Sequence, residues 1–180
     1  MKKTTFLLAL IITAGSLFAQ KQTTTSATVS FDATTEKDAL PKAANNAVIG
    51  AINPATGEVA FEAAVKNFAF ANPKMQEHFN GDKWFNSTVF PVFSFTGKID
   101  GLKKVKFNKD GVYKVMVTGE MKVKDVSHTE KIAGTITIAG GKTTLNASFN
   151  LKLADYNITG APVDAGKVAK EPKVTVLATF

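Results

Sequence analysis

Apolar and polar residues alternate one for one along most of this chain, and that pattern constrains the fold more than any other feature. The clearest run lies between 143 and 153, where every second residue is apolar: Leu145, Ala147, Phe149, Leu151 and Leu153. A side-chain period of two indicates β-strands with one apolar and one polar face, and sheets of such strands are typically antiparallel. The sequence therefore predicts an all-β, antiparallel protein.

Turn signals separate the alternating runs. The segments 53–57, 108–111 and 139–142 are rich in Gly, Asn, Asp and Pro, as hairpin connectors are. We count about eight strands, near 26–34, 45–53, 57–66, 91–100, 102–107, 111–124, 130–139 and 143–154, with a last one near 172–180. Strands at this spacing indicate a sandwich or a barrel. We find no internal repeat of the kind that marks a propeller or a solenoid.

One stretch near 73–85 breaks the alternation. Asn72 in the N-cap position and Pro73 in the first helical position predict a short helix that ends at Gly81. The segment is too short to have a core of its own, yet it carries four large apolar residues: Met75, Phe79, Trp84 and Phe85. Either these residues plug the end of a barrel, or they line the mouth through which a ligand enters.

The apolar face of each strand has to be buried against another layer or by closure of the sheet on itself. About eight strands close into a barrel whose interior holds side chains or one small ligand. The residues with inward parity are the candidates for the wall of that lumen: Phe31, Ile49, Phe61, Phe93, Phe95, Val115, Val117, Met121, Ile136, Phe149 and Leu151. If side chains from opposite walls interdigitate instead, the same residues are ordinary core contacts.

Composition excludes several classes of protein. The 180 residues contain no cysteine, which excludes a disulfide scaffold, a zinc–thiolate site, an iron–sulfur cluster and a cysteine nucleophile. The net charge is +7, but all 22 basic residues are lysine. Because specific reading of guanine relies on the arginine guanidinium, we expect no nucleic acid as a partner.

We expect no enzymatic activity. His78 lies in the predicted helix and His128 in a predicted hairpin turn, and the sequence has no third histidine. The chain contains no metal-ligand spacing, no nucleophile elbow and no glycine-rich phosphate loop. The sequence thus predicts no catalytic residue, no metal site and no cofactor.

The first residues predict export. Lys2 and Lys3 precede an apolar run over 6–14, and Ala19 stands at the expected cleavage site, which is the layout of a signal peptide. The run is too short for a membrane span, which needs ~20 apolar residues. We therefore expect a cleaved signal peptide at 1–19 and one soluble domain at 20–180, in the periplasm or secreted.

Four segments in one order resemble the YceI-like family of bacterial polyisoprenoid-binding barrels: 52–61, 75–95, 115–126 and 151–158. The second has the family's short helix, then an aromatic residue, a Ser, a Pro and an apolar-x-Phe strand. The fourth ends in Asp155-Tyr156-x-Ile158, similar to the family's closing strand. Asp125 departs from the glycine usual in the third. The resemblance covers roughly residues 26–180.

The resemblance implies an elongated antiparallel eight-stranded barrel of lipocalin-like shape, with a short helical lid segment near 73–85. It also implies that the lumen sequesters or carries a long isoprenoid or another apolar lipid, in the periplasm or outside the cell, often in a homodimer. The alternative is a filled barrel without a bound lipid, acting as a structural or interaction protein of the cell envelope.

Overall fold

The computed structural model describes residues 21–180, and the predicted signal peptide at 1–19 lies outside the described residues. The strands are β1 (Gln22–Asp32), β2 (Lys42–Ile52), β3 (Glu58–Ala64), β4 (Ala69–Phe70), β5 (Val92–Ile99), β6 (Gly111–Val123), β7 (Val126–Ala139), β8 (Lys142–Asn150) and β9 (Lys173–Thr179). The helices are α1 (Pro73–Asn80) and α2 (Ala161–Asp164), with short 3₁₀ turns η1 (Val65–Asn67), η2 (Leu102–Lys104) and η3 (Leu153–Tyr156).

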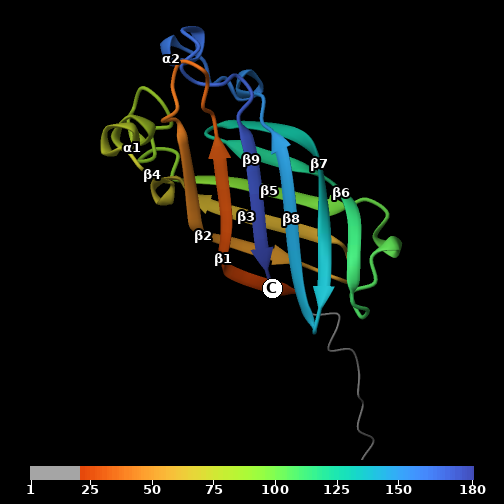
Figure 1. Cartoon of the computed structure of the whole chain (residues 1–180). Coiled ribbons are helices and arrows are strands. Elements are labelled where there is room, and N and C mark those ends of the chain that lie inside the picture. The colour runs from red at the N-terminus through yellow and green to blue at the C-terminus, as the bar shows by residue number, and fades with distance from the viewer. Residues whose placement is uncertain (1–20) are drawn as a thin grey trace, which may run out of the picture.

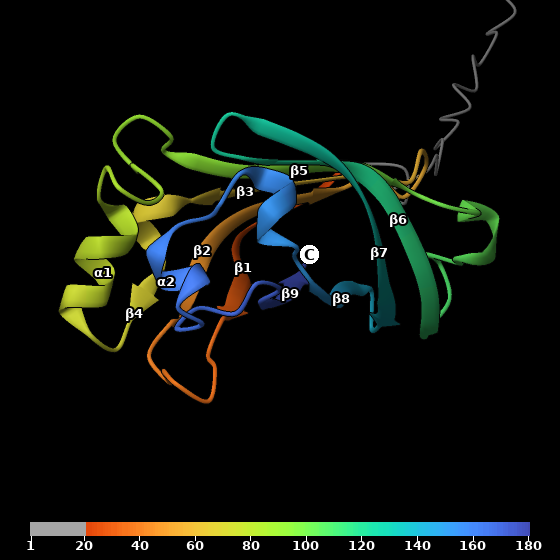
Figure 2. The same ribbon diagram turned by 90° about the horizontal axis from the view of Figure 1, so that it is seen from above.

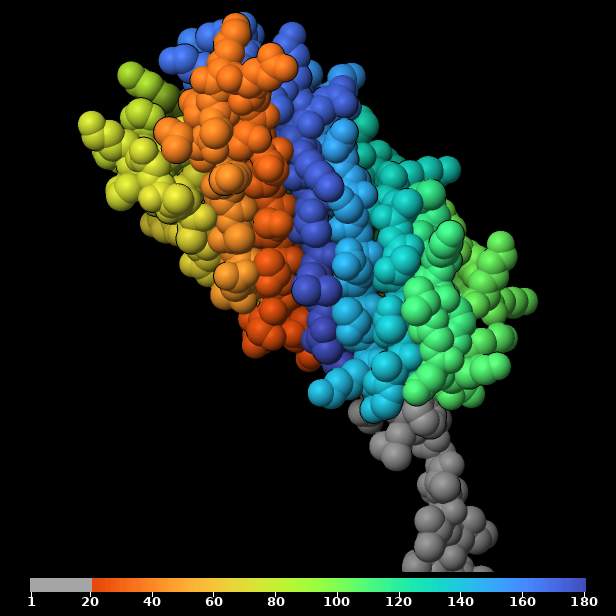
Figure 3. All heavy atoms as spheres, in the orientation of Figure 1, coloured from red at the N-terminus to blue at the C-terminus, as the bar shows by residue number. Residues whose placement is uncertain are grey.

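The strands form one closed antiparallel barrel (Figure 1). Within residues 21–180, eight strands follow each other in the order β1-β9-β8-β7-β6-β5-β3-β2, and pairing between β1 and β2 closes the ring. The two-residue strand β4 adds to β2 alone. Figure 3 shows one side of the barrel as a closely packed wall made by β2, β1, β9 and β8. The predicted all-β, eight-stranded antiparallel barrel is confirmed.

The helices and the longer loops gather at one end of the barrel, which we call the mouth end (Figures 1 and 2). Here α1 lies to one side of the opening, while η3 and α2 lie over it. The loop 33–41 joins this cap, because Thr35 Oγ1 donates a hydrogen bond to the Gly166 carbonyl at 2.9 Å and Lys37 Nζ donates one to the Ala165 carbonyl at 3.1 Å. The opposite, base end has the short turns between β2 and β3 and between β7 and β8, and the longer connection 100–110 that contains η2.

The interior is divided into two groups of buried residues. The mouth cluster combines residues of the barrel wall with residues of the cap: Ala27, Ala33, Ala43, Val48, Ala63, Val65, Phe68, Phe79, Phe85, Val123, Leu153, Tyr156, Ile158, Val163, Val168 and Ala178. The base cluster is built mainly from strands: Ile52, Val59, Ile99, Val105, Val115, Val117, Ile132, Ile136, Ile138, Leu145 and Ala147. Isoleucine and valine dominate the base cluster, whereas the buried phenylalanines Phe68, Phe79 and Phe85 belong to the mouth cluster.

The helix α1 begins and ends where the sequence predicts. The Asn72 side chain accepts hydrogen bonds from the backbone N–H groups of Lys74 and Met75, at 2.9 and 3.3 Å. The helix stops at Asn80, since the Gly81 N–H closes its last turn. The chain then folds back onto the helix, where the buried Ser87 donates its N–H to the Asn80 carbonyl at 3.1 Å. This short segment is thus fixed in place at the mouth end.

The prediction of a strand at 102–107 is wrong. Gly101 adopts a left-handed conformation (φ 65°), and the chain continues into the 3₁₀ turn η2 instead. The apolar residues of this stretch follow a spacing of three from Leu102 to Val105, which a two-residue strand period does not accommodate. Val105 is 7% exposed and closes the base end of the core.

Candidate functional site

A cavity of about 150 Å³ lies inside the barrel at the mouth end. Apart from Ser94, the described residues that line it are apolar or aromatic. Apolar cavities of ~150 Å³ stay dry and take up molecules the size of benzene. The barrel is therefore partly hollow: open within the mouth cluster and filled with side chains in the base cluster.

The structure brings most of the predicted site residues together around this cavity. Seven predicted wall residues line it: Phe31, Phe61, Phe93, Phe95, Met121, Phe149 and Leu151. All four predicted mouth residues line it as well: Met75, Phe79, Trp84 and Phe85. They come from β1, β3, β5, β6, α1, the turn that follows α1, and the chain at the end of β8, so distant parts of the sequence meet here.

Three predicted wall residues face the interior but do not line the cavity. Val115, Val117 and Ile136 belong to the base cluster, where they are 9%, 6% and 0% exposed. Their inward orientation agrees with the alternation of β6 and β7. They are core contacts, because side chains from opposite walls meet at this level of the barrel.

The prediction that Ile49 belongs to the wall of the lumen is wrong: its side chain points outward and is 52% exposed. The register between β1 and β2 shifts between the pairs Ala27–Val48 and Val29–Asn45, so β2 has one residue more than β1 there. Such a bulge reverses the parity of all residues beyond it. The buried Asn45 supports the bulge, because its Oδ1 accepts the Ala47 N–H at 2.9 Å.

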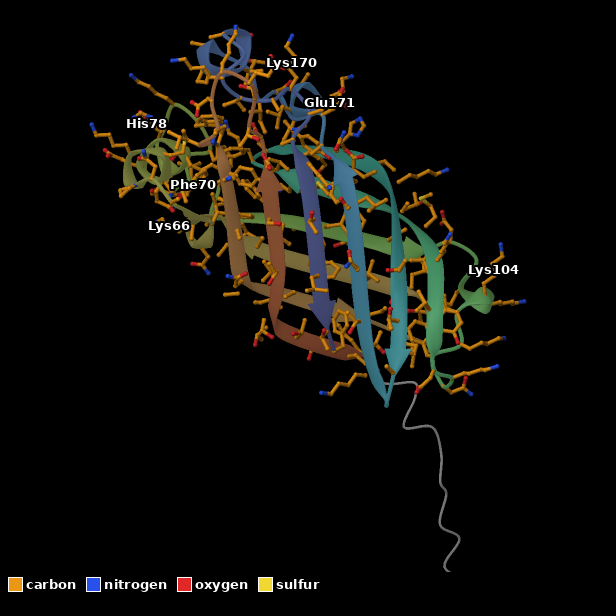
Figure 4. The ribbon with its side chains drawn as sticks, in the orientation of Figure 1. Lys66, Phe70, His78, Lys104, Lys170 and Glu171 are labelled. Carbon is orange, nitrogen blue, oxygen red and sulfur yellow. The ribbon has the colours of Figure 1, made fainter. Side chains whose placement is uncertain are left out.

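Sequence reasoning missed part of the lining. Phe70 is the second residue of the two-residue strand β4 and Phe68 precedes that strand, which is too short to show an alternating pattern. Others come from the cap and the loops around it: Ala33, Pro41, Leu153, Ile158, Val168 and Pro172. Figure 4 labels Phe70 at the mouth end, with Lys104 at the opposite end of the barrel. The sequence signal that could have found Phe68 and Phe70 is Phe79 on the nearby helix, because an apolar residue on a helix face requires apolar partners.

The aromatic rings at the mouth form a connected group centred on Phe79. Its ring centroid lies 4.6 Å from that of Phe85, 5.0 Å from that of Phe70, 5.7 Å from that of Phe31 and 5.9 Å from that of Phe68. These separations are typical of favourable aromatic pairs. The rings attach α1 to the barrel and form one side of the cavity.

Trp84 lines the cavity and carries a buried polar atom without a partner among the described residues. Its ring stacks on Phe85 at 6.0 Å with an interplanar angle of 10°. The indole Nε1 is buried, and no atom within residues 21–180 accepts its hydrogen bond. A buried donor without an acceptor is unfavourable by roughly 1–3 kcal/mol.

A cluster of three polar side chains holds η3 against the barrel. Tyr156, which is 1% exposed, donates its hydroxyl to Glu130 Oε1 at 2.8 Å, and His128 Nδ1 lies 3.6 Å from the same oxygen. His128 lies within β7, not in the predicted turn, and pairs with Met121. Burial raises the pKa of Tyr156, and its hydrogen bond to the negatively charged Glu130 raises it further.

Replacing Tyr156→Phe should lower the free energy of unfolding at neutral pH by about 1–3 kcal/mol, because Glu130 loses its donor. A tyrosine whose pKa is raised on folding stabilises the native state fully below the unfolded pKa of ~10, and this contribution decreases as the pH rises above that value. The difference between wild type and variant should therefore shrink above pH ~10 in urea unfolding. A difference that stays constant across this range would show that the hydroxyl is not held as described.

Among the described residues, none of those that line the cavity is a histidine, an acid or a lysine. Residues 21–180 contain no group of three or more histidine and acidic side chains placed to bind a metal ion. His78 is exposed on α1 at the mouth end (Figure 4). Nor does the described part of the chain include a helix with the length and apolar character that crossing a membrane requires.

Comparisons with known proteins agree with this geometry. The chain superposes on BcnA of Burkholderia cenocepacia with a TM-score of 0.70 and 19% identity, over 86% of this chain and 96% of that one. A polyisoprenoid-binding domain from Saccharophagus degradans, implicated in plant cell wall breakdown, gives 0.72 and 13%, over 86% and 93%. The YceI protein of Campylobacter jejuni gives 0.55 and 14%, over 100% and 99%.

These likenesses establish the fold. No curated protein matches the sequence. The family model described as the YceI-like domain matches residues 14–180, which is nearly the whole chain. The chain belongs to the YceI-like family.

Proposed function

We propose that this protein is an exported, non-enzymatic binding protein that sequesters or carries a long apolar lipid, such as a polyisoprenoid, inside its barrel. Its family and fold are those of a barrel binding protein. The single observation that carries the lipid proposal is the cavity, which is enclosed by apolar side chains at the mouth end and ends within the barrel. The signal-peptide pattern at 1–19 supports export.

An apolar wall selects ligands by buried area. Burying roughly 500 Å² of a ligand yields ~12 kcal/mol at ~25 cal/mol per Å². Association costs ~4–15 kcal/mol in lost translational, rotational and conformational freedom. A short acyl tail is therefore bound weakly, and a long chain is needed for tight binding.

A long chain occupies more space than the cavity of about 150 Å³ provides. The rest of such a chain extends past the aromatic rings at the mouth, which bound the cavity on the side of α1. Trp84 is the best reporter of binding, since it lines the cavity and the chain has one Trp.

The test is the content of the barrel. Protein purified from its native compartment without detergent should release a chain of several isoprene units on solvent extraction, detected by mass spectrometry. Adding the extracted lipid, or a long prenyl alcohol, to stripped protein should shift the fluorescence of Trp84. Binding without a spectral shift would remove Trp84 from the site but leave the proposal intact.

The second function to consider is a filled barrel that binds a protein partner and no lipid. The base cluster favours it, because that half of the lumen is already occupied by side chains. If extraction repeatedly yields no lipid and the stripped protein takes up none of the prenyl alcohols, the carrier proposal is wrong. The filled barrel that binds a protein partner is then favoured.

A further inference from the structure

We propose that five side chains form a floor across the barrel, and that this floor sets the length of chain the protein holds. The inference rests on the proposed function, since it concerns which apolar chains the cavity accepts. The floor residues share two properties: each lines the cavity, and each also packs against the base cluster. They are Phe61, Phe95, Met121, Phe149 and Val176.

The floor spans the lumen from several sides. Its residues come from β3, β5, β6, β8 and β9, which are five of the strands in the barrel wall. Phe61 pairs directly with Phe95, and Phe95 pairs directly with Met121, so these three lie side by side on neighbouring strands. Directly paired residues point to the same face and lie at the same level. Below them the base cluster fills the interior.

Glycines hold the floor rings in place. Gly97 and Gly119 are paired on β5 and β6, and the Phe95 ring lies against both. A Cβ at Gly119 would come within 2.7 Å of Phe95 Cζ, and one at Gly50 within 2.8 Å of Phe61 Cε1. Each ring thus occupies space that exists only because the opposing residue lacks a side chain. Neither ring can move closer to the glycines on which it packs.

A ligand that enters at the mouth can therefore extend only as far as the floor. Each isoprene unit accommodated above it should raise affinity by at least about tenfold, given ~0.8 kcal/mol per buried CH₂. Units beyond this length remain outside the cavity and add little. The affinity for a series of prenyl alcohols should rise with chain length and then level off.

The experiment measures the chain length at which affinity levels off. Prenyl alcohols of increasing length displace an anilinonaphthalene sulfonate dye from the stripped full-length mature protein. Phe95→Ala opens space of one phenyl ring below the cavity, so the levelling-off should move to a longer chain by about one isoprene unit. Val176→Phe adds a ring to the floor and should move it to a shorter chain. The second variant keeps the test valid if the first does not fold.

The matched control is Phe93→Ala. It removes the same atoms from the same strand, and Phe93 lines the cavity, but it packs against the mouth cluster and not against the base cluster. It should lower affinity for every chain and leave the levelling-off length unchanged.

The outcomes separate the two proposals. Shifts in opposite directions for Phe95→Ala and Val176→Phe, with none for Phe93→Ala, support the floor. If wild type binds the alcohols but affinity never levels off, or levels off at the same length in the folded variants, the floor is overturned while lipid binding stands. If wild type binds none of the alcohols, the carrier proposal itself fails, and the floor with it.

Discussion

Replacing Phe79→Ala is expected to lower the free energy of unfolding by about 3–5 kcal/mol, the range for truncation of a buried phenylalanine. Phe79 is 3% exposed, and its ring contacts four other phenylalanines that belong to the barrel or to the turn after α1. Its loss leaves a void in the middle of these rings. Equilibrium urea unfolding, followed by far-ultraviolet circular dichroism, measures the change.

Val89→Ala is the control for Phe79→Ala, because Val89 lies in the connection between α1 and β5 and is 61% exposed. A surface substitution of this kind should change stability by less than about 0.5 kcal/mol. A loss of less than ~1 kcal/mol in Phe79→Ala would mean that α1 is not anchored by its aromatic contacts.

Gly119→Ala is expected to cost about 3 kcal/mol, the upper part of the usual range for overpacking. The added Cβ would lie 2.5 Å from the Gly97 Cα and 2.5 Å from the Thr96 carbonyl oxygen. Both are backbone atoms of the neighbouring strand β5, so relief requires β5 and β6 to separate. Thermal and urea unfolding should both show the loss.

Gly111→Ala makes the same change on the same strand and serves as its control. The nearest atoms to its Cβ would all belong to the Tyr113 side chain, at 3.3 Å and beyond, rather than to the backbone. We expect little change in stability there. Equal losses at the two positions would indicate a general intolerance of β6 to alanine rather than close contact between the paired glycines.

The architecture could be predicted from the sequence because strand periodicity is a local property. In β6 and β8 the apolar residues recur at every second position, and their side chains face the interior as expected. The start of α1 was equally readable, since Asn72 and Pro73 act through backbone groups a few residues away. No long-range information is needed for either prediction.

The errors arose where a local pattern is changed by pairing with another strand. Nothing in the alternation of 45–53 reveals the bulge that turns Ile49 outward, although two consecutive asparagines, Asn45 and Asn46, are unusual in a strand. The limits of the cavity were also unreadable. Val117 and Phe61 both have inward parity, and only the barrel's cross-strand register shows that one lies in the filled half and the other at the boundary.

The unequal filling of the two ends bears on how the molecule opens. The base cluster joins β2, β3, β5, β6, β7 and β8, whereas the mouth end is covered by the loop 33–41, α1 and the segment 153–170. Surface segments such as these can separate at the expense of their own contacts alone, with the strand ladders intact. We therefore expect opening of the mouth end and global unfolding to be distinct events, so that the proposed guest exchanges while the strands stay paired.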